Sequence, residues 1–135
     1  MQTAERLEQY ERITGREAED FLARAVKLVQ ENLPEFTEYF PDSNSEGNFY
    51  PQTENREWTT GFWTGEIWLA YERTKDENLK KAGLLQAKSF LKRITERVDV
   101  DNHDMGFLYT PSCVAAYRLT GDETAKKPPL WQRII

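Results

Sequence analysis

Residues 70–77 read AYERTKDE, and residues 116–123 repeat much of this string as AYRLTGDE. Five of the eight pairs are identical, and Lys80-Lys81 recur as Lys126-Lys127 at the same spacing. Each copy has the pattern of a helix end, a short Thr-x-Asp turn and a helix start, because aspartate is a favoured N-cap. Asp-capped turns resemble one another, but the shared Ala-Tyr and Lys-Lys positions favour a true repeat, as in stacked or circular helical arrays. We therefore predict an all-α fold of αα-hairpin repeats.

Hydrophobic spacing around the repeat predicts four helices, over residues 17–33, 60–73, 77–98 and 111–119. Thr14 and Glu17 have the spacing of a capping box before the first helix, and Asp76 is the expected N-cap of the third. We expect the first helix to bury one apolar face and the second to be buried over much of its circumference. Residues 35–58 and 99–110 are predicted loops, and the one candidate strand, residues 107–109, is too short to build a sheet.

Charge and composition exclude several classes of protein. The 135 residues suit one domain, and 18 basic against 23 acidic residues make a poor nucleic-acid-binding protein. No apolar run approaches the roughly 18 residues of a membrane helix, and residues 1–16 lack the apolar segment of a secretory signal. The single cysteine, Cys113, excludes an internal disulfide. We expect a cytoplasmic protein with no nucleic-acid and no membrane partner.

The C-terminal residues interrupt the repeat. A helix is expected after Asp122, as after Asp76, but Pro128 and Pro129 fall in its second turn, where each costs about 3 kcal/mol. Read one nucleotide out of phase, suitable codons for residues 127–135 encode Lys-Ala-Ala-Leu-Met-Ala-Ala-Asp-Asn, a good helical sequence. We therefore interpret residues 128–135 as an aberrant, frameshifted tail on the N-terminal fragment of a longer protein. The alternative is the natural tail of a small helical protein.

Residues 99–107, DVDNHDMGF, hold three carboxylates and the only histidine. A calcium-binding EF-hand loop needs glycine at its sixth position and glutamate at its twelfth, where this chain has Asp104 and Thr110. Two interpretations remain open. The acids and His103 are structural, since Asp and Asn favour turns, or one acid is catalytic, with a pKa raised by its neighbours and an aromatic patch. We expect no metal and no cofactor.

Residues 58–68, WTTGFWTGEIW, are rich in aromatic side chains. Trp63 and Trp68 are expected in the core, whereas Trp58 lies where a loop meets a helix and its ring is free to stack on a sugar. Gly61 and Gly65 share one side of the helix and would permit a second helix to approach closely. Carboxylates together with exposed aromatic rings are what a carbohydrate-active enzyme needs.

Four motifs, in this order, make the chain resemble the unsaturated glucuronyl hydrolases, glycoside hydrolase family 88. They are WTTGFWTGE at 58–66, WLAYE at 68–72, NHDMGF at 102–107 and PSCVAAY at 111–117. The resemblance extends from about the first helix to Lys127. It implies an (α/α)6 barrel of helical hairpins, of which this chain would be the N-terminal portion. A related unsaturated-galacturonyl family fits these motifs less well.

The resemblance also implies an activity and a site. The family removes a 4,5-unsaturated uronic acid from glycosaminoglycan-derived disaccharides: an aspartate protonates C4 of the enol ether, water adds at C5, and the hemiketal collapses. Asp104 matches the first of two aspartates, Trp58 a ring that stacks on the unsaturated sugar, and Phe62 and His103 pocket residues. The second aspartate would lie beyond Lys127, so we expect these 135 residues to be inactive alone. The alternative is a small non-catalytic helical module that self-associates, or binds a partner, through an exposed apolar face.

Overall fold

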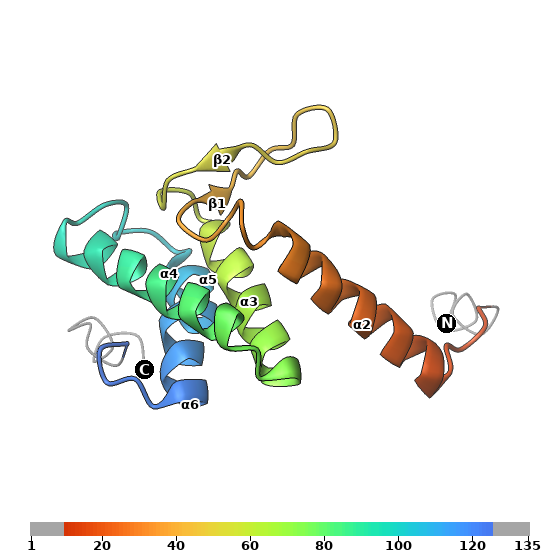
Figure 1. The fold of residues 1–135 in the computed structure, drawn as a ribbon. Coiled ribbons are helices and arrows are strands. Elements are labelled where there is room, and N and C mark those ends of the chain that lie inside the picture. Colours follow the sequence, from red (N-terminus) through yellow and green to blue (C-terminus); the bar gives the residue numbers. More distant parts are fainter. Residues whose placement is uncertain (1–9, 126–135) are drawn as a thin grey trace, which may run out of the picture.

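Helices make up most of residues 10–125, the part of the chain that the computed structural model describes (Figure 1). They are α2 (Gly15–Asn32), α3 (Thr60–Thr74), α4 (Glu77–Thr95), α5 (Met105–Tyr109), the π-helical turn η1 (Thr110–Val114) and α6 (Ala115–Thr120). Two short strands, β1 (Phe40–Pro41) and β2 (Gln52–Thr53), pair antiparallel between α2 and α3. The predicted all-α class is confirmed apart from this small ribbon.

The two copies of the repeat have the same backbone geometry. Lys75 and Gly121 both adopt a left-handed conformation, with φ of 57° and 71°, and end α3 and α6. Their backbone N–H groups donate to the carbonyls of Tyr71 and Tyr117, each at 2.8 Å. Two side-chain hydrogen bonds also recur. The threonine hydroxyl donates to the alanine carbonyl four residues earlier, in Thr74–Ala70 and in Thr120–Ala116. The aspartate carboxylate accepts from the backbone N–H two residues later, in Asp76–Asn78 and in Asp122–Thr124. The sequence repeat is therefore a structural repeat.

The core lies between α3 and α4, with η1 packed against both. Its largest buried apolar side chains are Phe40, Ile67, Trp68, Leu79, Phe90 and Leu108. Trp63 and Trp68 are buried, as predicted. Gly83 of α4 lies directly on Trp68, so closely that a Cβ there would be 2.6 Å from the indole ring.

Two glycines of α3 bring the last helix close, as predicted. A Cβ on Gly61 would lie 2.2 Å from the carbonyl oxygen of Phe107, and one on Gly65 would lie 2.8 Å from Cβ of Pro111. Rotating a side chain cannot relieve these contacts, because Gly61 faces backbone atoms and Gly65 faces the rigid ring of a proline. The absence of side chains at these positions therefore fixes where α5 and η1 sit against α3.

Helix α2 forms as predicted, but most of its apolar face stays exposed. Thr14 and Glu17 make the reciprocal bonds of a capping box. Val29 is buried, whereas Phe21, Leu22 and Leu28 are exposed. In Figure 1 α2 diverges from α3–α6 toward its N-terminus, and Glu19 near that end pairs with Arg73 in the last turn of α3. The predicted burial of one face is therefore wrong within residues 10–125, where α3 covers only part of it.

Two helix boundaries also differ from the predictions. Helix α4 ends at Thr95 rather than at residue 98, because Arg97 and Asp99 turn into left-handed conformations. The last helix begins at Met105 rather than Pro111, and residues 107–109 are helical. Pro111 falls in the π-helical turn η1, where the wider ring accommodates a residue that has no N–H to donate.

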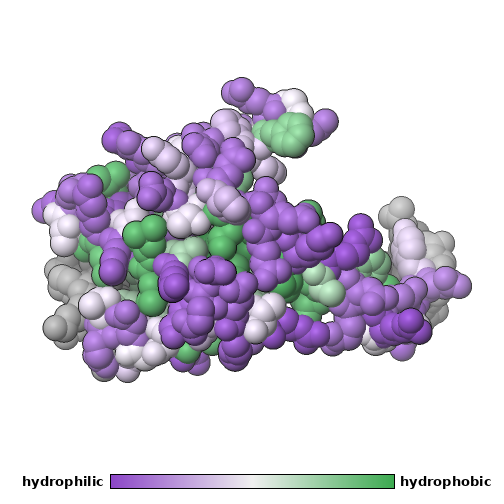
Figure 2. Space-filling model, viewed as in Figure 1, coloured by the Kyte–Doolittle hydropathy of each residue, from purple (hydrophilic) through white to green (hydrophobic). Residues whose placement is uncertain are grey.

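Hydrophilic side chains cover much of the molecule, with apolar side chains showing in the middle of the face seen in Figure 2. None of the helices between residues 10 and 125 combines the length and apolarity that crossing a bilayer requires. The predicted aberrant tail, residues 128–135, lies outside the described residues.

Candidate functional site

Three aromatic rings meet at the N-terminal end of α3, and we call them the aromatic cluster: Trp58, Phe62 and Phe107. The ring centroids are 5.9 Å apart for Trp58–Phe62, 5.6 Å for Phe62–Phe107 and 6.4 Å for Trp58–Phe107. The side chains nevertheless remain 45%, 43% and 50% exposed. Contiguous exposed apolar surface of this kind marks a binding site more often than a folding element. Trp58 lies at the loop–helix junction, as predicted, and its half-exposed ring also packs against Phe62 and Phe107.

Asp104 begins the helix that carries Phe107. Its backbone carbonyl accepts hydrogen bonds from the N–H groups of Phe107, at 2.9 Å, and Leu108, at 3.1 Å. Its own N–H donates to Oδ1 of Asn102, at 2.9 Å. The side chain is half-buried. The backbone of Asp104 is therefore fixed on both sides, three residues before Phe107 of the aromatic cluster.

His103 and the other acids of the loop are less closely integrated. The His103 side chain is 92% exposed, with Nε2 3.3 Å from Oδ1 of Asp104, which is an ion pair only when the imidazole is protonated. Asp99 accepts a hydrogen bond from the buried Arg93 at 3.3 Å, and Asp101 is exposed. Between residues 10 and 125, no three Asp, Glu, His or Cys side chains converge to hold a metal ion.

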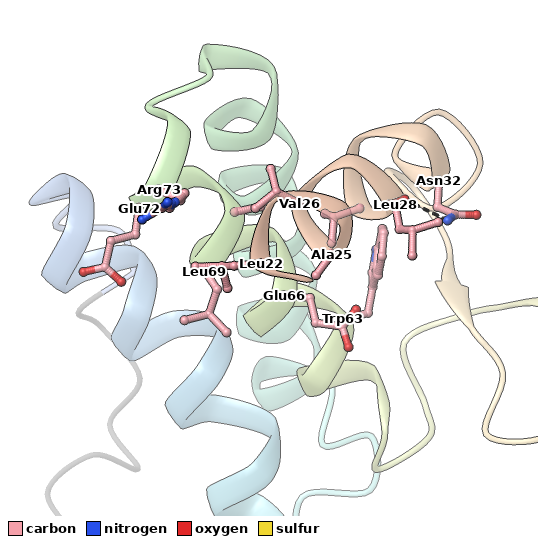
Figure 3. A pocket seen from close by; sticks show the side chains of 12 residues that line it. Leu22, Ala25, Val26, Leu28, Asn32, Trp63, Glu66, Leu69, Glu72 and Arg73 are labelled. Atoms are coloured by element: carbon pink, nitrogen blue, oxygen red, sulfur yellow. Dashed lines mark hydrogen bonds between the residues drawn. The ribbon is translucent and has the colours of Figure 1, made fainter. Parts of the chain in front are cut away.

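A cavity of about 750 Å³ lies between α2 and α3 (Figure 3). Leu22, Val26, Leu69 and Trp63 give it apolar walls, and the Glu66 side chain points into it. Desolvation by burial raises the pKa of Glu66 above its ordinary value. This cavity shares α3 with the aromatic cluster but opens along the helix rather than at its N-terminal end.

Sequence reasoning missed two residues of the site. Phe107 falls in a predicted loop, although an aspartate three residues earlier, at Asp104, is a common residue at the N-cap position of a helix. Arg93 reads as a surface cation by residue type, although it continues the buried row of α4 that contains Leu79, Gln86 and Phe90. Its guanidinium bonds to the segments on either side of the site, because both expose backbone carbonyls toward α4.

The sequence of the chain is similar to that of known enzymes that act on unsaturated disaccharides. No protein-family model matches the chain. It is 42% identical over 118 residues to an unsaturated chondroitin disaccharide hydrolase of Streptococcus pneumoniae, a match covering 87% of this chain and 30% of the relative. It is 45% identical over 113 residues to the protein of that name from Streptococcus agalactiae, covering 84% of this chain and 28% of the relative. The chain thus spans about 30% of the length of these relatives.

A solved structure shows that the fold agrees as well. An aspartate-to-asparagine variant of unsaturated glucuronyl hydrolase from Streptococcus agalactiae, complexed with dGlcA-GalNAc6S, superposes with a TM-score of 0.84 at 43% identity. The match covers 90% of this chain and 32% of that one. The helical hairpins thus match part of the structure of the unsaturated glucuronyl hydrolases, which are (α/α)6 barrels. The chain belongs to the unsaturated glucuronyl hydrolase family.

Proposed function

We propose that this chain supplies part of the sugar site of an unsaturated glucuronyl hydrolase. Trp58 and Phe62 would contact the unsaturated uronic acid, His103 would line the pocket, and Asp104 would be one of two catalytic aspartates. The observation that carries the proposal is the mutual contact of three half-exposed aromatic rings beside the helix start that holds Asp104. The complex of the Streptococcus agalactiae relative with dGlcA-GalNAc6S supports an unsaturated disaccharide as the ligand class.

The chemistry proposed for the complete site is hydration of an enol ether. A proton goes to C4 of the unsaturated uronic acid, and water, losing a proton, bonds through its oxygen to C5 to give a hemiketal. The bond between C5 and the ring oxygen then breaks to leave a ketone at C5 and a hemiacetal at C1. That hemiacetal collapses to an aldehyde as the bond from C1 to the second sugar breaks and the departing sugar takes up a proton. An aspartate serves such a step because the same carboxyl group can give and take a proton. Asp104 is the only one of the two implied aspartates within these 135 residues, so we predict binding without measurable hydrolysis.

Titration with an unsaturated chondroitin disaccharide tests the proposal. We expect binding to change the tryptophan fluorescence, and Trp58→Ala to weaken binding about tenfold, in line with about 0.5–1.5 kcal/mol for an aromatic contact. Leu69→Ala is the matched control, because Leu69 is also an exposed apolar residue of α3 but lines the α2–α3 cavity. Equal loss in both variants, or none in either, would contradict the proposed site.

Asp104→Asn tests the catalytic part separately. We expect the unsubstituted chain to release no product from the disaccharide, and the variant to bind it about as well. Clear turnover by the 135-residue chain, abolished in Asp104→Asn, would overturn the prediction that a second aspartate is required.

The α2–α3 cavity favours a second candidate function, which is self-association. Leu22, Leu28 and Leu69 are exposed there, on a mostly apolar face whose polar residues are Asn32, Glu66, Glu72 and Arg73. Sedimentation velocity should show concentration-dependent dimers or larger species, and Leu28→Glu should reduce them because it places a charge on the apolar face. A chain that stays monomeric at high concentration would exclude this candidate.

A further inference from the structure

The aromatic cluster and Asp104 depend on two irregular segments. Trp58 lies near the end of the segment between β2 and α3, and Asp104 ends the segment between α4 and α5. Neither is held in place by helix or sheet hydrogen bonds of its own. Besides the ring contact between Trp58 and Phe107, one buried side chain bonds to both segments: Arg93 in the last turn of α4, whose side chain is 1% exposed.

One part of the Arg93 guanidinium holds the segment before Trp58. Nη2 donates to the carbonyl of Arg56 at 2.8 Å, and Nη1 donates to the carbonyl of Glu57 at 3.0 Å and to Oδ1 of Asn55 at 3.1 Å. Arg56 and Glu57 are the two residues directly before Trp58. The backbone that presents the indole ring is therefore fixed on consecutive peptide groups.

Another part of the Arg93 guanidinium holds the start of the segment that leads to Asp104. Nε donates to the carbonyl of Val98 at 3.1 Å, and Nη2 lies 3.3 Å from Oδ2 of Asp99. The Val98 N–H returns a bond to the carbonyl of Arg93 at 2.9 Å. Arg97 and Asp99 on either side have φ of 56° and 46°, a conformation that non-glycine residues rarely adopt. Arg93 thus holds a tight turn in a conformation that its residues do not favour alone.

We propose that Arg93 is a positioning residue, whose guanidinium sets the separation and orientation of the two segments that present Trp58 and Asp104. The proposal rests on the sugar-binding function proposed above for those residues. Arginine is suited to the task because its planar group carries five N–H donors in fixed directions, whereas lysine has one ammonium group and no fork. Arg93 acts through the backbone and is not itself assigned a contact with substrate.

Gln86, two turns earlier on the same buried row of α4, provides a matched control. Its Nε2 donates to the carbonyl of Phe36 at 2.6 Å, and its Oε1 accepts from Oγ1 of Thr64 at 2.7 Å. The Phe36 carbonyl also accepts the indole N–H of Trp63, at 2.8 Å. Gln86 therefore holds a loop beside Trp63, as Arg93 holds the loops beside Trp58.

Fluorine NMR of the 5-fluorotryptophan-labelled chain tests the proposal, because each tryptophan resonance reports its own surroundings. In Arg93→Lys we expect the Trp58 resonance to shift and that of Trp68 to stay. Gln86→Met should shift the Trp63 resonance and leave that of Trp58. We also expect Arg93→Lys to weaken binding of unsaturated chondroitin disaccharide about tenfold, because small displacements of a binding group are costly, and Gln86→Met to leave the affinity unchanged within about twofold.

A milder variant guards against loss of folding. Asn55→Ala removes one acceptor of Arg93 beside Trp58 and should shift the same resonance by less. An unmoved Trp58 resonance in folded Arg93→Lys and Asn55→Ala, or an equal shift in Gln86→Met, would overturn the proposal. A shifted resonance in a chain that never binds the disaccharide would support the positioning and contradict the sugar function. Normal binding in Arg93→Lys would contradict the positioning and leave the sugar function standing.

Discussion

Helix α3 and the residue pair before it place aromatic side chains in two opposite environments. Trp63 and Trp68 are buried against α4 and the loop after α2, and Trp68 is only 1% exposed. Trp58 and Phe62, from the same short stretch of sequence, remain half-exposed and contact each other and Phe107. Residue type and spacing are alike in the two groups, so the difference comes from what covers each side of the helix.

Packing explains why Trp63 and Trp68 are buried, but it does not explain why the aromatic cluster stays exposed. Gly83 lets α4 close on Trp68, and the Trp63 indole N–H donates to the carbonyl of Phe36, so both rings fill the core. The aromatic cluster keeps large apolar surface in contact with water, which a folding role alone would not select. Substitutions in the two groups should therefore separate stability from binding.

The largest difference is expected between Trp68→Ala and Trp58→Ala. Truncating the buried indole should lower the free energy of unfolding by about 3–5 kcal/mol, because it removes buried surface and leaves a cavity. Truncating the exposed indole should lower it by less than about 1 kcal/mol. Urea denaturation followed by circular dichroism measures both, and similar losses would erase the distinction between the two groups.

High pH should lower the stability of the fold through two buried side chains of the core, Tyr109 and Cys113. Desolvation by burial raises the pKa of Tyr109 to about 12 and that of Cys113 to about 12, so the folded chain keeps both protons after the unfolded chain has lost them. Stability is therefore full below about pH 9 and falls as the pH rises toward 12, with Tyr109 contributing at most about 2–3 kcal/mol. Tyr109→Phe should remove that share of the decline. Parallel pH profiles of the two proteins in urea denaturation would contradict the burial of this phenol.

Glycine substitutions should affect both groups but with different consequences for binding. Gly83→Ala and Gly61→Ala each force a contact, with the Trp68 ring and the Phe107 carbonyl respectively, and should cost about 1–3 kcal/mol. Only Gly61→Ala displaces Phe107 and should also weaken disaccharide binding. Gly15→Ala is the control, since nothing lies within 4 Å of a Cβ there. Equal affinities of all three variants for the disaccharide would show that α5 does not contribute to the binding site.

The smallest effect is expected for Phe62→Leu. The substitution keeps an apolar side chain but removes ring contacts with Trp58 and Phe107, so stability should fall by about 0.5–1 kcal/mol. The affinity for the disaccharide should fall because a stacking surface is lost. Thermal unfolding and fluorescence titration of one preparation report both quantities, and a loss of stability alone would assign Phe62 to the core.

Local sequence rules predicted the capped helix starts and the repeat. Thr14–Glu17 and Asp76 specify their caps through short hydrogen bonds between neighbouring residues, which need no tertiary context. Trp63 and Trp68 were predicted as core, and Trp58 as free, because a ring just outside a helix has fewer neighbours than rings within it. The likeness to a known family rested on longer motifs and went further than any of these rules.

Long-range hydrogen bonds explain where the sequence was misleading. By hydropathy and spacing alone Leu85 belongs on the apolar face of α4 with Leu79 and Ala82, yet Leu85 is exposed and Gln86 and Arg93 are buried. Both polar side chains are satisfied by loop carbonyls that a pattern within α4 cannot reveal. Phe107 was missed for a related reason, since its helix starts before Pro111 and the π-helical turn absorbs the proline.

Chemical-shift mapping of the 135-residue chain with unsaturated chondroitin disaccharide tests most directly whether the aromatic cluster and Asp104 form a sugar site. We expect the perturbed signals to belong to Trp58, Phe62 and Phe107 and to the backbone around Asp104. The proposed site would be contradicted if a saturating concentration of the disaccharide left these signals unchanged, or perturbed only the α2–α3 cavity around Leu22 and Leu69.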